Sequence, residues 1–291
     1  MRAEPGAVAS LSFDAIGTAW QIDTPAPIPA ATVSRMQALI EDFDRTWSRF
    51  RSDSLVAEVA TTAGDWVFPA EAPALVGLYS ALHTATQGAM SPLVGGSLTH
   101  LGYGAGYSLV PGSGSIASPD WQAMDWDGTR LRTEEPIELD VGAAGKGLLV
   151  DLVVELLEHD GIEQIVVDAS GDLRHAGGDP VRVALEHPYD TTKAIGIATL
   201  ADGALCASAS NRRVWGSGLH HVLDARTGIP VDEVVATWVS ADTAMLADAI
   251  ATALFFSPAE DLAVVAEFEH VRMFTDGRAE MSAGFPGELF R

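Results

Sequence analysis

The sequence has little cysteine, little positive charge and no long apolar run. Its single cysteine, Cys206, excludes an internal disulfide framework and a thiolate metal cluster. No stretch approaches the ~20 apolar residues that a membrane-spanning helix needs. The 17 basic and 40 acidic residues give a net charge of −23, so we expect neither nucleic acid nor an anionic membrane as a partner. Any site for a phosphorylated ligand must therefore be locally cationic, and a bound Mg²⁺ would provide that charge.

The rest of the composition describes a large globular protein. With 291 residues, 47% of them hydrophobic, the chain can bury a core as one broad domain or as two intimate lobes. Its 28 glycines and 15 prolines are typical of a loop-rich enzyme. We expect a single domain over residues 1–291, with a surface loop in the Gly/Ser/Pro-rich segment 111–119.

The N-terminal residues 1–10 bear on the cellular location of the protein. They contain neither a basic leader followed by an apolar core nor a lipid-attachment cysteine. We therefore expect a cytoplasmic protein, with earlier removal of a leader as the alternative.

Hydrophobic periodicity and turn residues predict a mixed α+β fold, because strand runs are broken by helices without a strict β-α-β order. One helix should carry the apolar stripe from Val33 to Phe50 and begin near Thr32. A capping box at Ser257 predicts a further helix that runs to Phe268. The other expected helices are 74–87, 147–159 and 243–256, and the expected strands are 11–22 with a turn at Ile16-Gly-Thr18, 164–167, 181–185, 195–200, 235–240 and 271–275, the last entering a hairpin.

Asp248 and Thr252 are four residues apart in an otherwise nearly nonpolar helix. That spacing places both oxygens on one helix face, one above the other. A carboxylate and a hydroxyl aimed together suggest a site for a hard cation such as Mg²⁺. A chance pair, or a carboxylate stabilised by its neighbour's hydroxyl, is the alternative.

The segment Gly142-Ala-Ala-Gly-Lys-Gly147 is not a Walker phosphate loop. Asp140 stands where that motif needs glycine, and Gly147 stands where it needs Ser or Thr. What remains is a glycine-rich turn from strand to helix, whose helix start favours anions and whose Lys146 could pair with a phosphate. A tight turn with a solvated lysine is the alternative.

His220 and His221 are adjacent, so on a strand their rings point to opposite faces and cannot share one zinc ion. One of them could face a pocket and act as a general base, since its unperturbed pKa lies near neutrality. An ordinary surface or core histidine is the alternative. Trp20, Phe50 and Tyr103 could form the wall against a planar ring, although such aromatics are more often part of a core.

Together these segments resemble the ApbE family, the FAD:protein FMN transferases. The resemblance covers almost the whole chain and rests on the order and spacing of several motifs. Arg212-Arg-Val-Trp215, before the two histidines, is similar to the actinobacterial branch. The motifs are Ile16-Gly-Thr18, Ser48-Arg-Phe50, Asp53-Ser-Leu55, Leu139-Asp-Val-Gly-Ala-Ala-Gly-Lys-Gly147, Ser170-Gly-Asp172, His221-Val-Leu-Asp-Ala-Arg-Thr-Gly-Ile-Pro230 and Ala247-Asp-Ala-Ile-Ala-Thr252.

The resemblance implies a function and a site. Mg²⁺ and FAD would bind in a cleft between two lobes, and FMN would move from FAD to a Ser or Thr hydroxyl of a target flavoprotein, with release of AMP. The implied metal ligands are Asp248, Thr252 and the backbone carbonyl of Ala143, and His221 matches the proposed base. The implied FAD contacts are Ile16, Phe50, Gly102, Tyr103, Gly104, Asp140, Lys146 and Val222.

The chain also departs from the family pattern. Ile16 replaces a methionine, Met90-Ser-Pro92 replaces Phe-Asp-Pro, and Ala225 replaces a proline. None of these changes removes an implied metal ligand or His221. Two alternatives remain: an FAD-binding or flavin-carrier protein, and an Mg²⁺-dependent FAD pyrophosphatase in which water replaces the acceptor hydroxyl.

Overall fold

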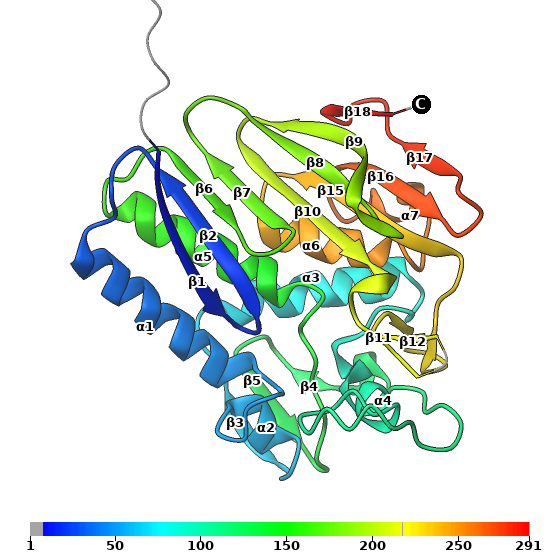
Figure 1. Cartoon of the computed structure of the whole chain (residues 1–291). Helices are drawn as coiled ribbons and strands as arrows, with labels where there is room; N and C mark the ends of the chain where they lie inside the picture. The colour runs from blue at the N-terminus through cyan, green and yellow to red at the C-terminus, as the bar shows by residue number, and fades with distance from the viewer. Residues whose placement is uncertain (1–7, 217, 291) are drawn as a thin grey trace, which may run out of the picture.

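A large antiparallel sheet organises the protein. The structure, a computed structural model, describes residues 8–216 and 218–290, so most of the N-terminal segment used above lies outside the described residues. Eight strands follow the order β1-β2-β6-β7-β10-β15-β16-β17 (Figure 1). They are β1 (Ala9–Ala15), β2 (Thr18–Thr24), β6 (Ile165–Asp168), β7 (Asp172–Ala176), β10 (Gly203–Ala209), β15 (Val234–Ala241), β16 (Glu269–Phe274) and β17 (Ala279–Met281).

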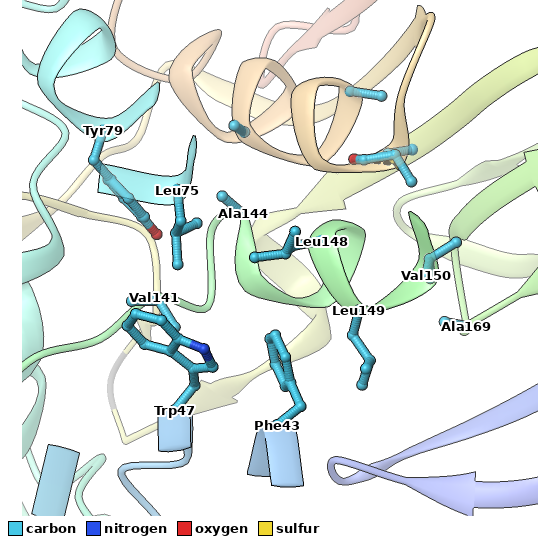
Figure 2. Close-up of a cluster of buried hydrophobic side chains, with 14 of the residues drawn as sticks. Phe43, Trp47, Leu75, Tyr79, Val141, Ala144, Leu148, Leu149, Val150 and Ala169 are labelled. Carbon is cyan, nitrogen blue, oxygen red and sulfur yellow. Dashed lines mark hydrogen bonds between the residues drawn. The ribbon is translucent and has the colours of Figure 1, made fainter. Parts of the chain in front are cut away.

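Helices cover one face of this sheet. The helices α5 (Gly145–His159) and α6 (Ala244–Ala253) contact the central strands, while α1 (Ala30–Trp47) packs on α5 and α3 (Ala72–Ala85) packs on α6. Figure 2 shows Phe43 on α1 directed toward the α5 residues Leu148 and Leu149, and Trp47 directed toward Val141. The largest hydrophobic core lies here and includes Trp20, Ile22, Phe43, Leu75, Leu149, Val153, Leu157 and Ile250.

A smaller sheet covers the opposite face. Its strands lie in the order β18-β9-β8, formed by β18 (Gly287–Leu289), β9 (Asp190–Leu200) and β8 (Val181–His187). A second core between the two sheets includes Leu173, Leu185, Leu205, Trp238 and Phe285. Because the large sheet is covered on both faces, β15 is buried continuously over residues 234–239.

Short elements form the lower part of the molecule in Figure 1. They are α2 (Leu55–Val59), α4 (Gly95–His100), the three-stranded sheet of β3 (Gly64–Val67), β5 (Arg130–Thr133) and β4 (Asp125–Trp126), and the pairs β11 (Val214–Trp215) with β12 (Leu219–His220) and β13 (Leu223–Asp224) with β14 (Ile229–Pro230). The 3₁₀ turns are η1 (Pro92–Val94), η2 (Trp121–Ala123) and η3 (Ser210–Arg212), and α7 (Ala259–Leu262) precedes β16. No helix among the described residues is long and apolar enough to cross a membrane.

The α+β prediction is confirmed, and most expected helices and strands are present within a few residues. The boundaries of two helices were wrong. The first helix ends at Trp47 because Ser48 is extended, so Phe50 lies beyond the helix. The same helix begins at Ala30, before the expected cap. Thr32 therefore lies inside the helix and donates its hydroxyl to Asp160. The helix predicted from Ser257 to Phe268 is only the four-residue α7, because the expected capping box does not form: the N-cap is Pro258, with no side-chain cap hydrogen bond.

The crossing of α5 and α6 is unusually close. A Cβ atom on Gly147 would lie 2.2 Å from the Ala244 carbonyl oxygen, so only glycine fits. Each helix also accepts hydrogen bonds from the start of the other: Asp248 on α6 accepts from the Gly147 N–H at 3.1 Å. In return, Asp151 on α5 accepts from the N–H groups of Ala244 at 2.9 Å and Met245 at 2.8 Å. These carboxylates satisfy first-turn N–H groups that have no partner within their own helices.

Gly147→Ala should strongly destabilise the protein, because the added methyl group would contact backbone atoms that cannot rotate away. We expect a loss of about 1–3 kcal/mol or more in the free energy of unfolding, measured by urea denaturation. Gly77→Ala, in the exposed middle of α3, is the matched control. A Cβ at Gly77 meets nothing within 4 Å, so this variant should be neutral or slightly stabilised. Equal stability of the two variants would contradict the close crossing.

Candidate active site

Two adjoining cavities lie between the large sheet and the lower elements. The first has a volume of about 670 Å³ and the second about 590 Å³. They meet at the β1–β2 turn and the start of α5. The residues that line both are Gly17, Thr18, Tyr103, Asp140, Gly142, Lys146 and Arg213. The two spaces therefore form one long cleft with a partly cationic middle.

The cleft gathers most of the residues singled out in the sequence. The first cavity is lined by Ala143, His221, Val222, Asp248 and Thr252, the second by Ile16 and Phe50, and both by Tyr103, Asp140 and Lys146. Gly102 and Gly104 are not among the described residues that line either cavity. Gly102 instead closes the loop behind Tyr103, because its carbonyl accepts from the Leu109 N–H at 2.9 Å and its φ is +90°.

Asp248 lies deep in the cleft and is only 6% exposed. Its neighbour Lys146 is also held by the protein. The Lys146 Nζ lies 3.1 Å from a carboxylate oxygen of Asp172 and donates to the Ala169 carbonyl at 3.0 Å. Asp172 is fully buried. Sequence reasoning did not select Asp172 as a site residue, although it belongs to the quoted motif Ser170-Gly-Asp172.

The buried charges in this cluster do not balance. Burial raises the pKa values of both Asp172 and Asp248, and the charge of Asp172 raises that of Asp248 further. Burial alone would lower the Lys146 pKa, but Asp172 and Asp248 outweigh it and raise the net value. When both acids are ionised, one lysine faces two carboxylates. The cluster therefore favours a further cation.

The donors around Asp248 fit a hard cation. No group of three or more His, Cys, Asp or Glu side chains that could hold a metal occurs in the described part of the chain. The available donors are instead the Asp248 carboxylate, the Thr252 hydroxyl and the Ala143 carbonyl, which line one cavity. All three are oxygens, the ligand type that Mg²⁺ prefers. The unbalanced carboxylates beside them supply the negative charge that binding a cation needs.

Asp140 is paired with an arginine that the sequence analysis did not select. Arg49 Nε donates to Asp140 at 2.5 Å, and both side chains are largely buried. Asp140 also accepts from the Gly142 N–H at 2.7 Å, which shapes the glycine-rich turn. Burial would raise the Asp140 pKa, but Arg49 and Gly142 lower it overall. Asp140 therefore positions the turn and Arg49 as an ionised carboxylate.

Aromatic rings form one wall of the second cavity. Phe50 stacks on Tyr107 with ring centroids 5.0 Å apart, and Tyr103 stacks on Trp215 at 5.3 Å. The Arg49 guanidinium lies 4.4 Å from the Phe50 ring centroid. Trp20 was expected in this wall, but it is 1% exposed in the main core. Burial raises the Tyr103 pKa to about 12, and Arg213 donates to its hydroxyl oxygen.

Ile16 marks the turn at the edge of the second cavity. Ile16 and Gly17 have φ values of 44° and 76°, the left-handed geometry of a two-residue hairpin turn between Ala15 and Thr18. A β-branched residue is strained in this region. Such strain is concentrated at functional sites, where the surrounding structure holds it in place.

The two histidines occupy different environments, although only His220 lies on a strand, β12, and His221 lies in the bend that follows it. His220 Nε2 donates to the Val231 carbonyl at 2.8 Å, and His220 Nδ1 accepts from the Val222 N–H at 3.3 Å. His220 is therefore a structural residue with both nitrogens satisfied. His221 lines the first cavity, and its buried Nδ1 has no hydrogen-bond partner within the described residues. Burial and then the charge of Arg213 lower the His221 pKa to about 3, so its ring is neutral at physiological pH.

Comparison with known proteins identifies the family to which the chain is similar. A model of the ApbE family matches residues 16–275. An FAD:protein FMN transferase of Rhodobacter capsulatus is 28% identical over 279 residues, which cover 88% of this chain but 53% of the relative. The chain thus spans about half the length of that relative. An FAD:protein FMN transferase of Vibrio cholerae is 27% identical over 290 residues, covering 92% of this chain and 87% of the relative.

Solved structures show the same fold. The ApbE protein of Thermotoga maritima matches with a TM-score of 0.81 at 22% identity, over 97% of this chain and 100% of that one. The flavin transferase ApbE of Vibrio cholerae matches with a TM-score of 0.79 at 24% identity, over 97% of this chain and 99% of that one. The resemblance inferred from the sequence motifs is confirmed: this chain belongs to the ApbE family.

Proposed function

We propose that this chain transfers FMN from FAD to a Ser or Thr hydroxyl of a target flavoprotein, with the help of Mg²⁺, and releases AMP. The observation that carries the proposal is the long cleft, in which the aromatic second cavity and the more polar first cavity meet, with a cluster of oxygen donors lining the first. Family membership, and the names of the relatives in particular, support this class of activity.

The shape and chemistry of the cleft suit FAD. That molecule has two planar ring systems joined by a pyrophosphate, and each cavity is large enough for one of them. Phe50 and Tyr103 provide an aromatic surface for a ring. Where the cavities meet, Arg213 and the start of α5 provide positive potential for the pyrophosphate, despite the strongly acidic protein around them.

The proposed metal ligands are Asp248, Thr252 and the Ala143 carbonyl. Bound Mg²⁺ would offset negative charge on the transferring and leaving phosphates. The protein contributes rigidity: Asp248 is fixed by the Gly147 N–H, and Thr252 follows one turn later on α6. Lys146 neutralises the charge of Asp172, so the Asp248 carboxylate is left to bind one divalent cation.

His221 is the proposed base. The acceptor hydroxyl oxygen would form a bond to the FMN phosphorus as the bond to the AMP phosphate breaks, and the hydroxyl proton would pass to the neutral imidazole of His221. Because Arg213 and Lys146 lower the pKa of the ring, anionic phosphates beside them would raise it and strengthen the base. AMP would leave with the electron pair of the broken bond.

Mass spectrometry tests the reaction directly. With FAD, Mg²⁺ and a candidate acceptor flavoprotein, the acceptor should gain the mass of FMN less one water as an equal amount of AMP appears. Free FMN and AMP without an adduct would identify a pyrophosphatase, and unchanged FAD would identify a carrier. His221→Ala should lower turnover about 10²–10⁴-fold with nearly unchanged FAD affinity. His220→Gln, which keeps a donor for Val231, should remain active.

Asp248→Asn should remove the response to Mg²⁺ without destabilising the metal-free protein. Burial and Asp172 raise the Asp248 pKa, so its ionised form costs folding free energy at neutral pH, whereas Asn still accepts from Gly147. With FAD present, Mg²⁺ at about 100 times its Kd should stabilise the wild type by about 2.7 kcal/mol. Thermal unfolding with and without Mg²⁺ measures this. Asp168→Asn, in the same cavity, should keep the response; an Mg²⁺ shift in Asp248→Asn equal to wild type would refute the assignment.

The stability of the protein should depend on pH through His221. The folded pKa of about 3 lies below the ~6.5 of an unfolded histidine, so between these values only the unfolded state binds the proton. Stability is therefore complete above pH ~6.5 and falls as the pH decreases. In urea denaturation at pH 7, 6 and 5, wild type should lose up to about 1.4 kcal/mol per pH unit more than His221→Gln. Parallel curves for the two proteins would show that the ring titrates normally.

A further inference from the structure

Tyr79 carries a hydroxyl that the fold does not use. The residue lies on α3, is 2% exposed and packs in the main core. Its ring extends past that core, because Tyr79 also lines the first cavity. The phenolic oxygen is buried and has no hydrogen-bond partner among the described residues. A buried hydroxyl left without a partner destabilises the folded state, so phenylalanine would be the better core residue.

The position of this hydroxyl relates it to the proposed metal and phosphate site. Figure 2 shows the oxygen end of Tyr79 directed from α3 toward the segment that holds Val141 and Ala144. Burial raises the Tyr79 pKa more than the nearby Ala143 backbone lowers it, and the phenolic oxygen has no hydrogen-bond partner among the described residues. The phenol thus points to the same turn whose Ala143 carbonyl is a proposed metal ligand.

The charges nearby determine what the phenol can do. Burial, then Asp140 and Asp248, raise the Tyr79 pKa well above its usual value, so the group stays protonated and neutral. Asp140 already has Arg49 and Gly142 as donors, and Asp248 has Gly147. A neutral O–H donor without an acceptor therefore faces a cavity in which an anionic oxygen would be its natural partner.

We propose that Tyr79 is a ligand-contacting residue that donates a hydrogen bond from its hydroxyl to a phosphate oxygen of the bound dinucleotide. This inference rests on the proposed function, because the phosphate is that of FAD held at the Ala143–Asp248 site. Nothing in the sequence distinguished Tyr79 from the apolar stripe of its helix. Its role follows from the contrast between a well-packed ring and an unpartnered hydroxyl.

Tyr79→Phe separates ligand binding from folding, since it removes only the hydroxyl. Without ligand, the melting temperature of the variant should equal or exceed that of wild type, because an unsatisfied polar group is lost. With Mg²⁺ present, isothermal titration should show FAD binding weakened about tenfold or more, the loss of a hydrogen bond to a charged group. FAD affinity within twofold of wild type would overturn the proposal. A melting temperature clearly below wild type would also overturn it, because the hydroxyl would then have a structural partner.

Tyr189→Phe is the matched control. This tyrosine is 61% exposed and is not among the described residues that line either cavity, so its variant should bind FAD as wild type does. The wild-type titration tests the proposed function itself: if wild type does not bind FAD, the proposed function fails. If wild type binds FAD and Tyr79→Phe binds it equally well, only the role of Tyr79 fails.

Discussion

The contact between α5 and α6 is the constraint on which the rest of the structure depends. Gly147 has no side chain, so the two helices meet backbone to backbone beneath the large sheet. Asp151 and Asp248 then each accept hydrogen bonds from the first turn of the opposite helix. A larger residue at Gly147 would separate the helices and leave buried N–H groups and carboxylates without partners, which is costly in a water-free interior.

This contact also builds the cleft. Lys146 precedes Gly147, so the same helix start that touches α6 places the lysine against Asp172 and the Ala169 carbonyl at the β6–β7 turn. Asp248 serves both purposes, as the acceptor for Gly147 and as a wall of the first cavity. The proposed metal site thus lies within the helix packing itself. A site fixed by helix packing holds its ligand oxygens in place. In exchange, two neighbouring carboxylic acids, Asp172 and Asp248, are buried, and burial raises their pKa values.

Two of the basic side chains in the cleft are also positioned by pairing with largely buried acids. An acidic protein that binds a phosphorylated ligand must gather cations locally, and Arg49, Lys146 and Arg213 all reach the cleft. Arg49 and Lys146 are fixed by Asp140 and Asp172. These pairs position the turn and the aromatic wall, while Arg213, which donates to the Tyr103 hydroxyl, borders both cavities. The unpartnered groups of His221 and Tyr79 border the same space.

Much of the fold could be predicted from the sequence, because its signals are local. Periodic apolar residues determined α3, α5 and α6, and turn residues determined the hairpins at Gly17 and Gly277. Spacing also placed Asp248 and Thr252 on one helix, α6, whereas the expected strand ends at His220 and leaves His221 in a bend. The local signal failed at Ser257, where the capping pattern does not form a side-chain cap and the helix that follows has only four residues.

Other features were decided only by the tertiary structure, because they depend on which distant segments meet. Arg49 pairs with Asp140, which is 91 residues away in the sequence. Lys146 pairs with Asp172, which follows the turn between β6 and β7. Burial then set the protonation states: it lowers the His221 pKa to about 3 and raises that of Asp248. The sequence determined which groups are present and on which helix face they lie. The packing of α5, α6 and the sheet decided which of them are paired, desolvated or left free, since partners and solvent exposure exist only in the folded chain.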